Sequence, residues 1–430
     1  MRIFLAFFLV QLFATNLIAQ SATSSAHADD PAGSSTTEAI ALRSLQLDEA
    51  LALAEQNSPQ LSEAEAAVNH AQASTQTARA HTNPSVEFMG GHQAARPITT
   101  PGVPGSTWRY AASQTVEIPK ERATRLRTAQ FDLAGNHFRR SGVQLSVEAE
   151  VKRAFFDVIR RKQQLAHARD NLALVEDLRR RVRLEVEVGE KGRLELTRAE
   201  AEMARAQAAV RNADVQLSNA RALLKVAIGV SSDDTFDAQG LLSSVITLAP
   251  LSELRPQVLL NHPALSEAQA LISRSTSAVE NERARRIPAP TFSGEYERQP
   301  DVTYYRFGVN IPLPLWDKRK GQIAEAQAEV NRSQALARQR QLEVTSALER
   351  AYDLYEISNQ QVEGLEAGSL REAEAAVEAA RNAYKFGERG IVEVLDAQRV
   401  LQGVRSDLLD AMFARQSALI DLEELGVKHQ

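Results

Sequence analysis

The sequence predicts a mainly α-helical protein with a small β part, built from two tandem repeats of helix, hairpin, long helix and helix. Three observations predict this fold. The motif Asn-x-Pro-x-Leu-Ser-Glu-Ala begins at Asn57 and recurs 204 residues later at Asn261. A Gly-x-x-Gly segment occurs at Gly189 and again at Gly387. Proline is absent from 120–249 and after 314, and both intervals have the Ala-, Leu- and Glu-rich composition of long helices. Repetition over so much of the chain indicates duplication.

Composition and motifs exclude several classes of function. A net charge of -5 in 430 residues gives no sign of nucleic-acid binding. The absence of cysteine excludes disulfides, thiolate metal sites, a cysteine nucleophile and a lipid anchor on cysteine. Phosphate-binding loops, His-Glu-x-x-His and Gly-x-Ser-x-Gly are also absent from the sequence. The 8 histidines are scattered, with none paired at i and i+4. We therefore expect neither an enzyme nor a metal or cofactor site.

The N-terminal segment resembles a secretory signal. Arg2 precedes an apolar run from Ile3 to Phe13, which is followed by small residues. This pattern predicts a signal peptide over 1–28, with an uncleaved anchor helix as the alternative. Residues 29–44 are rich in Ser, Thr, Ala and Asp, and we expect a flexible leader there.

The first repeat is expected over 45–230. After Pro84 the hydrophobic period changes from helical to two, which predicts a β-hairpin between helices. The expected elements are a helix from Leu47 to Thr82 with a kink or break at Asn57-Ser58-Pro59, strands 85–95 and 107–118, a long helix 120–188 and a helix 193–228.

The second repeat, 251–427, follows a linker over 231–250. Its expected elements are a helix 251–286, strands 290–298 and 303–312, a long helix 316–386 and a helix 391–426. Each long helix would extend roughly 100 Å, about the length of two of the shorter helices end to end. We therefore expect each long helix to pack beside a stacked pair of shorter ones.

The helices that follow the glycine segments carry a heptad pattern. Large residues occupy one seam position of the first helix and alanines the other, which allows close helix approach. These residues are Leu196, Met203, Val210, Leu217 and Leu224, with Ala199, Ala206, Ala213, Ala220 and Ala227. The helix of the second repeat keeps the pattern except at Arg415.

The four expected strands do not complete a sheet on their own in lipid, because the edge strands of an open sheet would leave backbone groups unsatisfied. Two chains would supply about eight strands and three about twelve, and the larger ring leaves an aqueous lumen. The alternation of apolar and polar residues along these strands is, by itself, equally compatible with ordinary soluble hairpins.

The order of these elements, given twice, resembles the TolC-like outer-membrane factor family over 45–427. The most specific segment is Tyr-Lys-Phe-Gly-Glu-Arg-Gly-Ile-Val-Glu-Val-Leu-Asp-Ala at 384–397. The resemblance implies a homotrimer with a 12-stranded β-barrel in the outer membrane and a periplasmic α-helical barrel. It implies a passive exit duct that works with a periplasmic adaptor and an inner-membrane pump of the resistance-nodulation-division (RND) class. Segments 286–290 and 311–321 look most like CzcC-type ducts, which implies heavy-metal cations as cargo.

The resemblance also implies functional residues at the periplasmic mouth. Side-chain contacts that hold the mouth closed are implied for the positions of Glu195, Tyr384 and Arg389. An acidic constriction that attracts cations is implied for the positions of Glu393 and Asp396. The turns, which the resemblance implies contact the adaptor, contain Gly189, Gly192, Gly387 and Gly390. The alternative is that these charges belong to ordinary exposed helix surfaces, where ion pairs contribute about 0–1 kcal/mol.

Other functions remain open at this point. A related duct would export drugs or secreted proteins instead of metals. A periplasmic adaptor also contains a long helical hairpin, but usually one copy set in β-rich domains. A structural coiled coil would explain the heptads but not the aromatic hairpins at matched positions.

Overall fold

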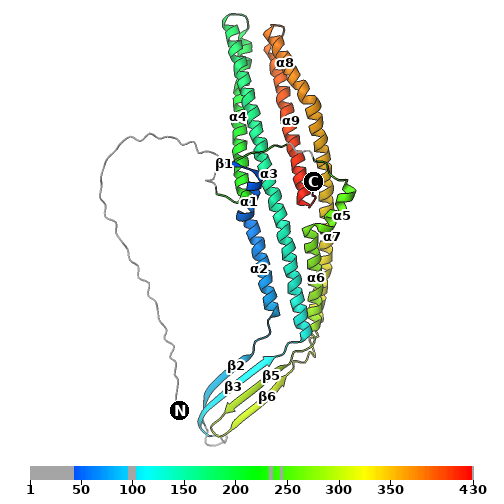
Figure 1. Cartoon of the computed structure of the whole chain (residues 1–430). Coiled ribbons are helices and arrows are strands. Elements are labelled where there is room, and N and C mark those ends of the chain that lie inside the picture. The colour runs from blue at the N-terminus through cyan, green and yellow to red at the C-terminus, as the bar shows by residue number, and fades with distance from the viewer. Residues whose placement is uncertain (1–42, 95–102, 232–235, 243–245, 429–430) are drawn as a thin grey trace, which may run out of the picture. The chain divides into compact units, whose positions relative to one another are not determined.

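The computed structural model describes residues 43–94, 103–231, 236–242 and 246–428. The predicted signal peptide and the predicted leader up to residue 42 lie outside the described residues. Within the described part, a predominantly helical fold with a small sheet is confirmed (Figure 1). No helix among these residues combines the length and the apolar character needed to cross a membrane.

The first repeat contains four helices and one hairpin. Its elements are α1 (Leu47–Asn57), α2 (Pro59–Arg79), β2 (Ser85–Gln93), β3 (Gly105–Thr115), α3 (Pro119–Glu187) and α4 (Arg193–Ile228). The expected first helix is broken between α1 and α2, where Pro59 occupies the first turn of α2 and the Ser58 hydroxyl accepts the backbone N–H of Leu61 at 3.5 Å.

The second repeat has the same order of elements. They are α5 (Leu251–Asn261), α6 (Pro263–Ala284), β5 (Thr291–Arg298), β6 (Thr303–Asn310), α7 (Lys320–Gly364), η1 (Leu365–Leu370), α8 (Arg371–Lys385) and α9 (Ile391–Glu424). At the break equivalent to that in the first repeat, Nδ1 of His262 accepts the N–H of Ala264 at 3.2 Å. One duplicated break is thus capped by a hydroxyl and the other by an imidazole.

The long helix of the second repeat differs from the prediction in two ways. It begins at Lys320 rather than at 316, because Asp317 accepts the N–H of Arg319 at 2.7 Å in a local turn and Arg319 has a left-handed φ of 55°. It is also interrupted by the π-helical turn η1, whose amino-acid composition does not distinguish it from the α-helix on either side.

The predicted leader and linker contain a short pairing that the sequence analysis missed. Strand β1 (Arg43–Leu45), which includes the last two residues of the expected leader, pairs in parallel with β4 (Phe236–Ala238) of the expected linker. Leu45 and Ala238 are buried in the largest apolar cluster, with Phe155 and Val151 of α3 and Ile228 of α4. Burial rather than strand periodicity therefore explains these three-residue strands.

The four hairpin strands form one antiparallel sheet in the order β2-β3-β5-β6. Strands β2 and β6 are its edges within the chain. The observed strands are shorter at their ends than expected, since β3 ends at Thr115 and β6 at Asn310. The expected end of β2 at residue 95 lies outside the described residues.

Helix packing follows the predicted seams. In α4 the buried seam residues are Ala199, Ala206, Leu217, Ala220 and Leu224. Arg415, which interrupts the seam of α9, is also buried, with 3% of its surface exposed. Its Nη1 donates to Oδ1 of Asn359 in α7 at 3.1 Å, so the seam contains a polar contact there.

Candidate functional site at the hairpin tips

Two helical hairpins end at matching glycine turns, at the opposite end of the helices from the sheet (Figure 1). Gly189 and Gly387 have φ values of 83° and 74°, a left-handed conformation that glycine adopts without strain. In the first turn the N–H of Gly189 donates to Val186 and that of Glu190 to Glu185, and the second turn repeats both bonds. This pairing is the Schellman motif of helix C-termini. Gly192 and Gly390 are the N-caps of α4 and α9.

A small apolar cluster joins the two tips. It contains Val182 of α3, Ala199 of α4 and Ile391 and Val394 of α9, with Tyr384 of α8 packed against it. Because these residues come from both repeats, the cluster holds the first hairpin against the second. The predicted heptad accounts for Ala199, which is a seam residue of α4.

Tyr384 makes a direct polar link between the repeats. Its hydroxyl donates to Oε2 of Glu185 in α3 at 2.6 Å. Burial raises the pKa of Tyr384, and the hydrogen bond to Glu185 and the charges of Glu185 and Glu195 raise it further. Tyr384 is therefore neutral and remains a donor at physiological pH.

The structure assigns this bond to a residue that the sequence analysis did not select. Glu195, the expected acid, is near enough to influence the pKa of Tyr384, but its buried Oε2 has no hydrogen-bond partner within the described chain. Arg389 is exposed, and among the described residues no side-chain bond or ion pair is found for it. Of the three predicted gate residues, Tyr384 and Glu195 are thus brought together and Arg389 stands apart.

The two predicted constriction acids lie in the first two turns of α9. Both are exposed. Oδ1 of Asp396 lies 2.9 Å from Arg399, whose guanidinium also lies 2.9 Å from Glu202 of α4. Glu393 lies in the first turn of α9, where the helix dipole favours a negative charge. Within one chain Asp396 is therefore charge-paired.

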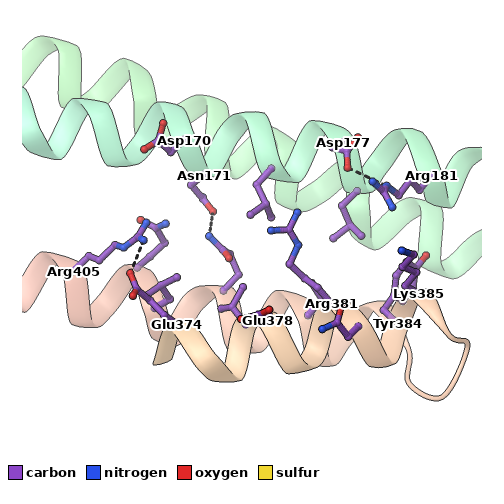
Figure 2. A pocket seen from close by; sticks show the side chains of 18 residues that line it. Asp170, Asn171, Asp177, Arg181, Glu374, Glu378, Arg381, Tyr384, Lys385 and Arg405 are labelled. Carbon is purple, nitrogen blue, oxygen red and sulfur yellow. Dashed lines mark hydrogen bonds and ion pairs between the residues drawn. The ribbon is translucent and has the colours of Figure 1, made fainter. Parts of the chain in front are cut away.

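A cleft of about 630 Å³ separates α3 from α8 and α9 next to the tips (Figure 2). One polar contact bridges it, from Gln398 of α9, which donates to Asn171 of α3 at 3.0 Å. On the far side, Arg405 of α9 contacts Glu374 of α8 at 2.9 Å. Gln398 is only 5% exposed, and its Oε1 has no partner in the described chain. The repeats therefore meet through polar groups here and through apolar groups at the tip cluster.

The described part of the chain contains no group of three His, Asp or Glu side chains arranged to hold a metal ion. The two histidines with shifted pKa values are dispersed. Burial lowers the pKa of His262, and burial together with the charge of Arg405 lowers that of His167. Neither arrangement amounts to a metal site or a catalytic centre.

Comparison with known proteins covers both repeats. A family model described as outer membrane efflux protein matches residues 50–230 and 254–426. The chain is 25% identical over 312 residues to the cobalt-zinc-cadmium resistance protein CzcC of Cupriavidus metallidurans, covering 72% of this chain and 74% of that protein. It is 26% identical over 309 residues to the nickel-cobalt-cadmium resistance protein NccC of Alcaligenes xylosoxydans xylosoxydans, with coverages of 71% and 68%. It is 24% identical over 404 residues to the pyoverdine export outer membrane protein OpmQ of Pseudomonas aeruginosa, with coverages of 88% and 84%.

Solved structures share the fold. A structure of CusC superimposes with a TM-score of 0.77 at 19% identity, covering 89% of this chain and 92% of that one. The CmeC outer membrane channel of Campylobacter jejuni superimposes with a TM-score of 0.78 at 15% identity, with coverages of 88% and 85%. At these identities the likeness establishes the fold alone.

Proposed function

Because the chain belongs to the outer membrane efflux protein family, we propose that three copies form the exit duct of a tripartite pump for divalent heavy-metal cations. Family membership confirms the predicted outer-membrane location and the role in efflux. The family consists of efflux proteins rather than enzymes, in keeping with the motifs absent from the sequence. The assembly, cargo and partners are the subjects of the proposal.

The sheet supports a closed assembly of several chains. Its edge strands β2 and β6 leave backbone N–H and C=O groups unpaired within the chain, and such groups need partners in lipid. One face carries an aromatic row from Phe88 through Tyr110 and Tyr296 to Tyr305, with neighbouring ring centroids 5.0, 6.2 and 5.3 Å apart. Three copies supply twelve strands, so β6 of each chain would pair with β2 of the next in a barrel.

Fractionation of cells and size determination in detergent test the assembly. We expect the protein in the outer-membrane fraction, extracted by detergent but not by salt, as a trimer. Deletion of 108–118 should abolish insertion, because it removes most of β3 and with it both the β2–β3 and the β3–β5 pairing. A soluble wild-type monomer obtained without detergent would contradict the proposal.

The names of two relatives motivate the choice of cargo. CzcC is described as a cobalt-zinc-cadmium resistance protein and NccC as a nickel-cobalt-cadmium resistance protein. Since the described residues hold no cluster of metal-ligating side chains, we propose that the duct conducts cations without selecting them and that an RND pump chooses the cargo. Deletion of the gene should then lower tolerance to every cation that the pump exports by similar factors. A stoichiometric, tight metal site on the purified protein would argue against this division of labour.

We assign the periplasmic mouth to the hairpin tips. The two turns of each chain, with Gly189 and Gly387 at their left-handed positions, would give six turns around the mouth of a trimer and form the contact with a periplasmic adaptor (membrane fusion protein). Tyr384 with Glu185 and Glu195 would restrain the opening, Arg389 is free to reach a neighbouring chain, and Glu393 and Asp396 would form the acidic constriction.

Cross-linking from cysteines introduced at Glu190 and Glu388 to the adaptor tests the contact between the turns and the adaptor. Cross-links confined to the sheet would disprove it.

Export of an organic molecule is the second candidate. It is favoured by the match to the pyoverdine export protein OpmQ, which covers more of this chain than the match to CzcC does. The same deletion strain discriminates the two: sensitivity to metals with unchanged secretion of organic products supports the first function, and the reverse supports the second.

A further inference from the structure

We infer that four charged side chains on one face of the sheet, Arg109, Glu295, Glu297 and Arg306, form a charge-compensated belt on the wall of the exit channel. We further infer that the two carboxylates keep this passage open to cations. This inference rests on the proposed trimeric duct and concerns a part of it remote from the hairpin tips. We call these four residues the charged belt.

The two faces of the sheet differ in character. Because side chains alternate along a strand, the register assigns Phe88, Tyr110, Tyr296 and Tyr305 to one face. Phe307, on the same face, is 90% exposed within the chain. Exposed aromatic and apolar side chains suit contact with lipid.

The opposite face is polar. One cross-strand row runs Glu87, Ala111, Glu295 and Arg306, and the next runs Met89, Arg109, Glu297 and Tyr304. A sheet with one face toward lipid directs the other toward the lumen once the ring is closed. The charged belt therefore lies on the channel side.

Contacts join the belt into one network over three strands. Glu295 of β5 lies 2.9 Å from Nε of Arg109 in β3 and 2.8 Å from Nη1 of Arg306 in β6. Nη2 of Arg306 lies 2.9 Å from Glu297. The carboxylates are the less accessible members, with Glu295 and Glu297 exposed by 16% and 19%. Glu295 is thus shared by both guanidinium groups.

The network places two positive and two negative charges on the wall. If Glu295 were neutral, two arginines and one carboxylate would face passing cations. The net positive charge would repel the cations, because the low-dielectric walls of a narrow passage focus the field of the charges on them. The two open edges of the first row also carry opposite charges, Glu87 on β2 and Arg306 on β6. Closure of the ring through these edges would bring complementary charges together between chains.

The test is the ion selectivity of the full-length trimer in planar bilayers, measured as the reversal potential in a KCl gradient. We expect Glu295→Gln to lower the potassium-to-chloride permeability ratio several-fold and Arg306→Gln to raise it. Glu343→Gln is the matched control, because it also removes one carboxylate from an ion pair, here with Arg340 at 2.8 Å on the exposed surface of α7. The control should leave the ratio unchanged.

The outcomes separate this inference from the proposed function. If both belt variants have the same ion selectivity as the wild type, the inference is overturned, but the proposed function as a duct is unaffected. If wild-type protein forms no channels, the proposed function fails first. If Glu295→Gln does not insert, Arg306→Gln decides alone, since an unchanged or lowered ratio in that variant contradicts the belt.

Discussion

Removal of one hydroxyl, in Tyr384→Phe, should loosen the closed arrangement of the hairpin tips. The phenyl ring retains its place against the apolar tip cluster, so the change isolates the 2.6 Å hydrogen bond to Glu185. A hydrogen bond to a charged group contributes about 1.5–3 kcal/mol. Glu185 is only partly buried and regains water when the hydroxyl is lost, so the lower value applies.

Three such bonds act together in a trimer. If the tips open as one unit, roughly 1.5 kcal/mol per chain sums to about 4.5 kcal/mol, which shifts the ratio of open to closed mouths by about 10³. Single-channel recording measures this shift as a higher mean conductance of the variant at neutral pH. Glu185→Ala should reproduce it, because it removes the acceptor of the same bond.

Tyr352→Phe is the control for loss of a hydroxyl. Tyr352 is bonded to Glu356 within the same helix, so its hydroxyl does not join the repeats. The reasoning is refuted if Tyr384→Phe conducts like the wild type, or if Tyr352→Phe shows an equal increase.

Four further substitutions test the packing of the helices. Gly229→Ala should destabilise the fold by more than about 1–2 kcal/mol, since its φ is 70° and an added Cβ would lie 2.7 Å from the carbonyl oxygen of Asn57. Burial lowers the pKa of His262, so its contribution is complete above about pH 6.5 and is lost as the pH falls through the folded-state pKa. His262→Ser should therefore reduce the drop in Tm between pH 7.5 and pH 5. Asn359→Ala should cost about 1.5–3 kcal/mol by removing an acceptor from buried Arg415, whereas Arg415→Met should be near neutral.

Controls for the Gly229 and His262 variants come from the other copy of each feature. Gly426→Ala places a Cβ in open space at a φ of 87°, so it reports the backbone strain without the clash. Ser58 caps the equivalent break of the first repeat with a hydroxyl, and it shows that serine is accepted at the position that His262 occupies in the second. Thermal unfolding followed by circular dichroism measures all of them. Equal loss of stability in the two glycine variants, or an unchanged pH dependence in His262→Ser, would contradict the assigned contacts.

Much of the fold was predictable because glycine and proline residues mark the ends of its helices, and these markers occur in both repeats. Helix α4 lies between Gly192 and Gly229 and has the predicted bounds, since glycine at a helix end is a strong local signal. The start of α3 at Pro119 is likewise marked by its proline. The pairing of β1 with β4 left no such trace, because three residues are too few to show a period. The turn η1 was equally hidden, since its residues have ordinary helical composition.

The candidate site was predictable in position but not in every contact. The glycine turns locate the hairpin tips to within a residue, and Tyr384 lies in the predicted tip. The predicted gate position Glu195 lies just after the turn, whereas the hydroxyl of Tyr384 bonds within the chain to Glu185, just before the turn. Both carboxylates are near the tip, and the choice between them depends on how α3, which carries Glu185, and α4, which carries Glu195, are rotated against α8. A heptad pattern specifies which face of a helix is buried. It does not specify the rotation closely enough to decide which of two neighbouring side chains reaches a given partner.

Apolar clusters of the second repeat follow α7, η1 and α9 toward the tips. Leu348 of α7 packs in an apolar cluster with Leu254 of α5 and Leu422 of α9, and beyond it the same helix continues into η1. Leu370 of η1 then contacts both the cluster around Leu408 and the one around Leu401. A π-helical turn has poorer hydrogen-bond geometry than the α-helices on either side and marks functional segments of helices. Because the tip cluster is small and η1 lies between α8 and the packed end of α7, we expect movement of α8 at the mouth to require little change in α7.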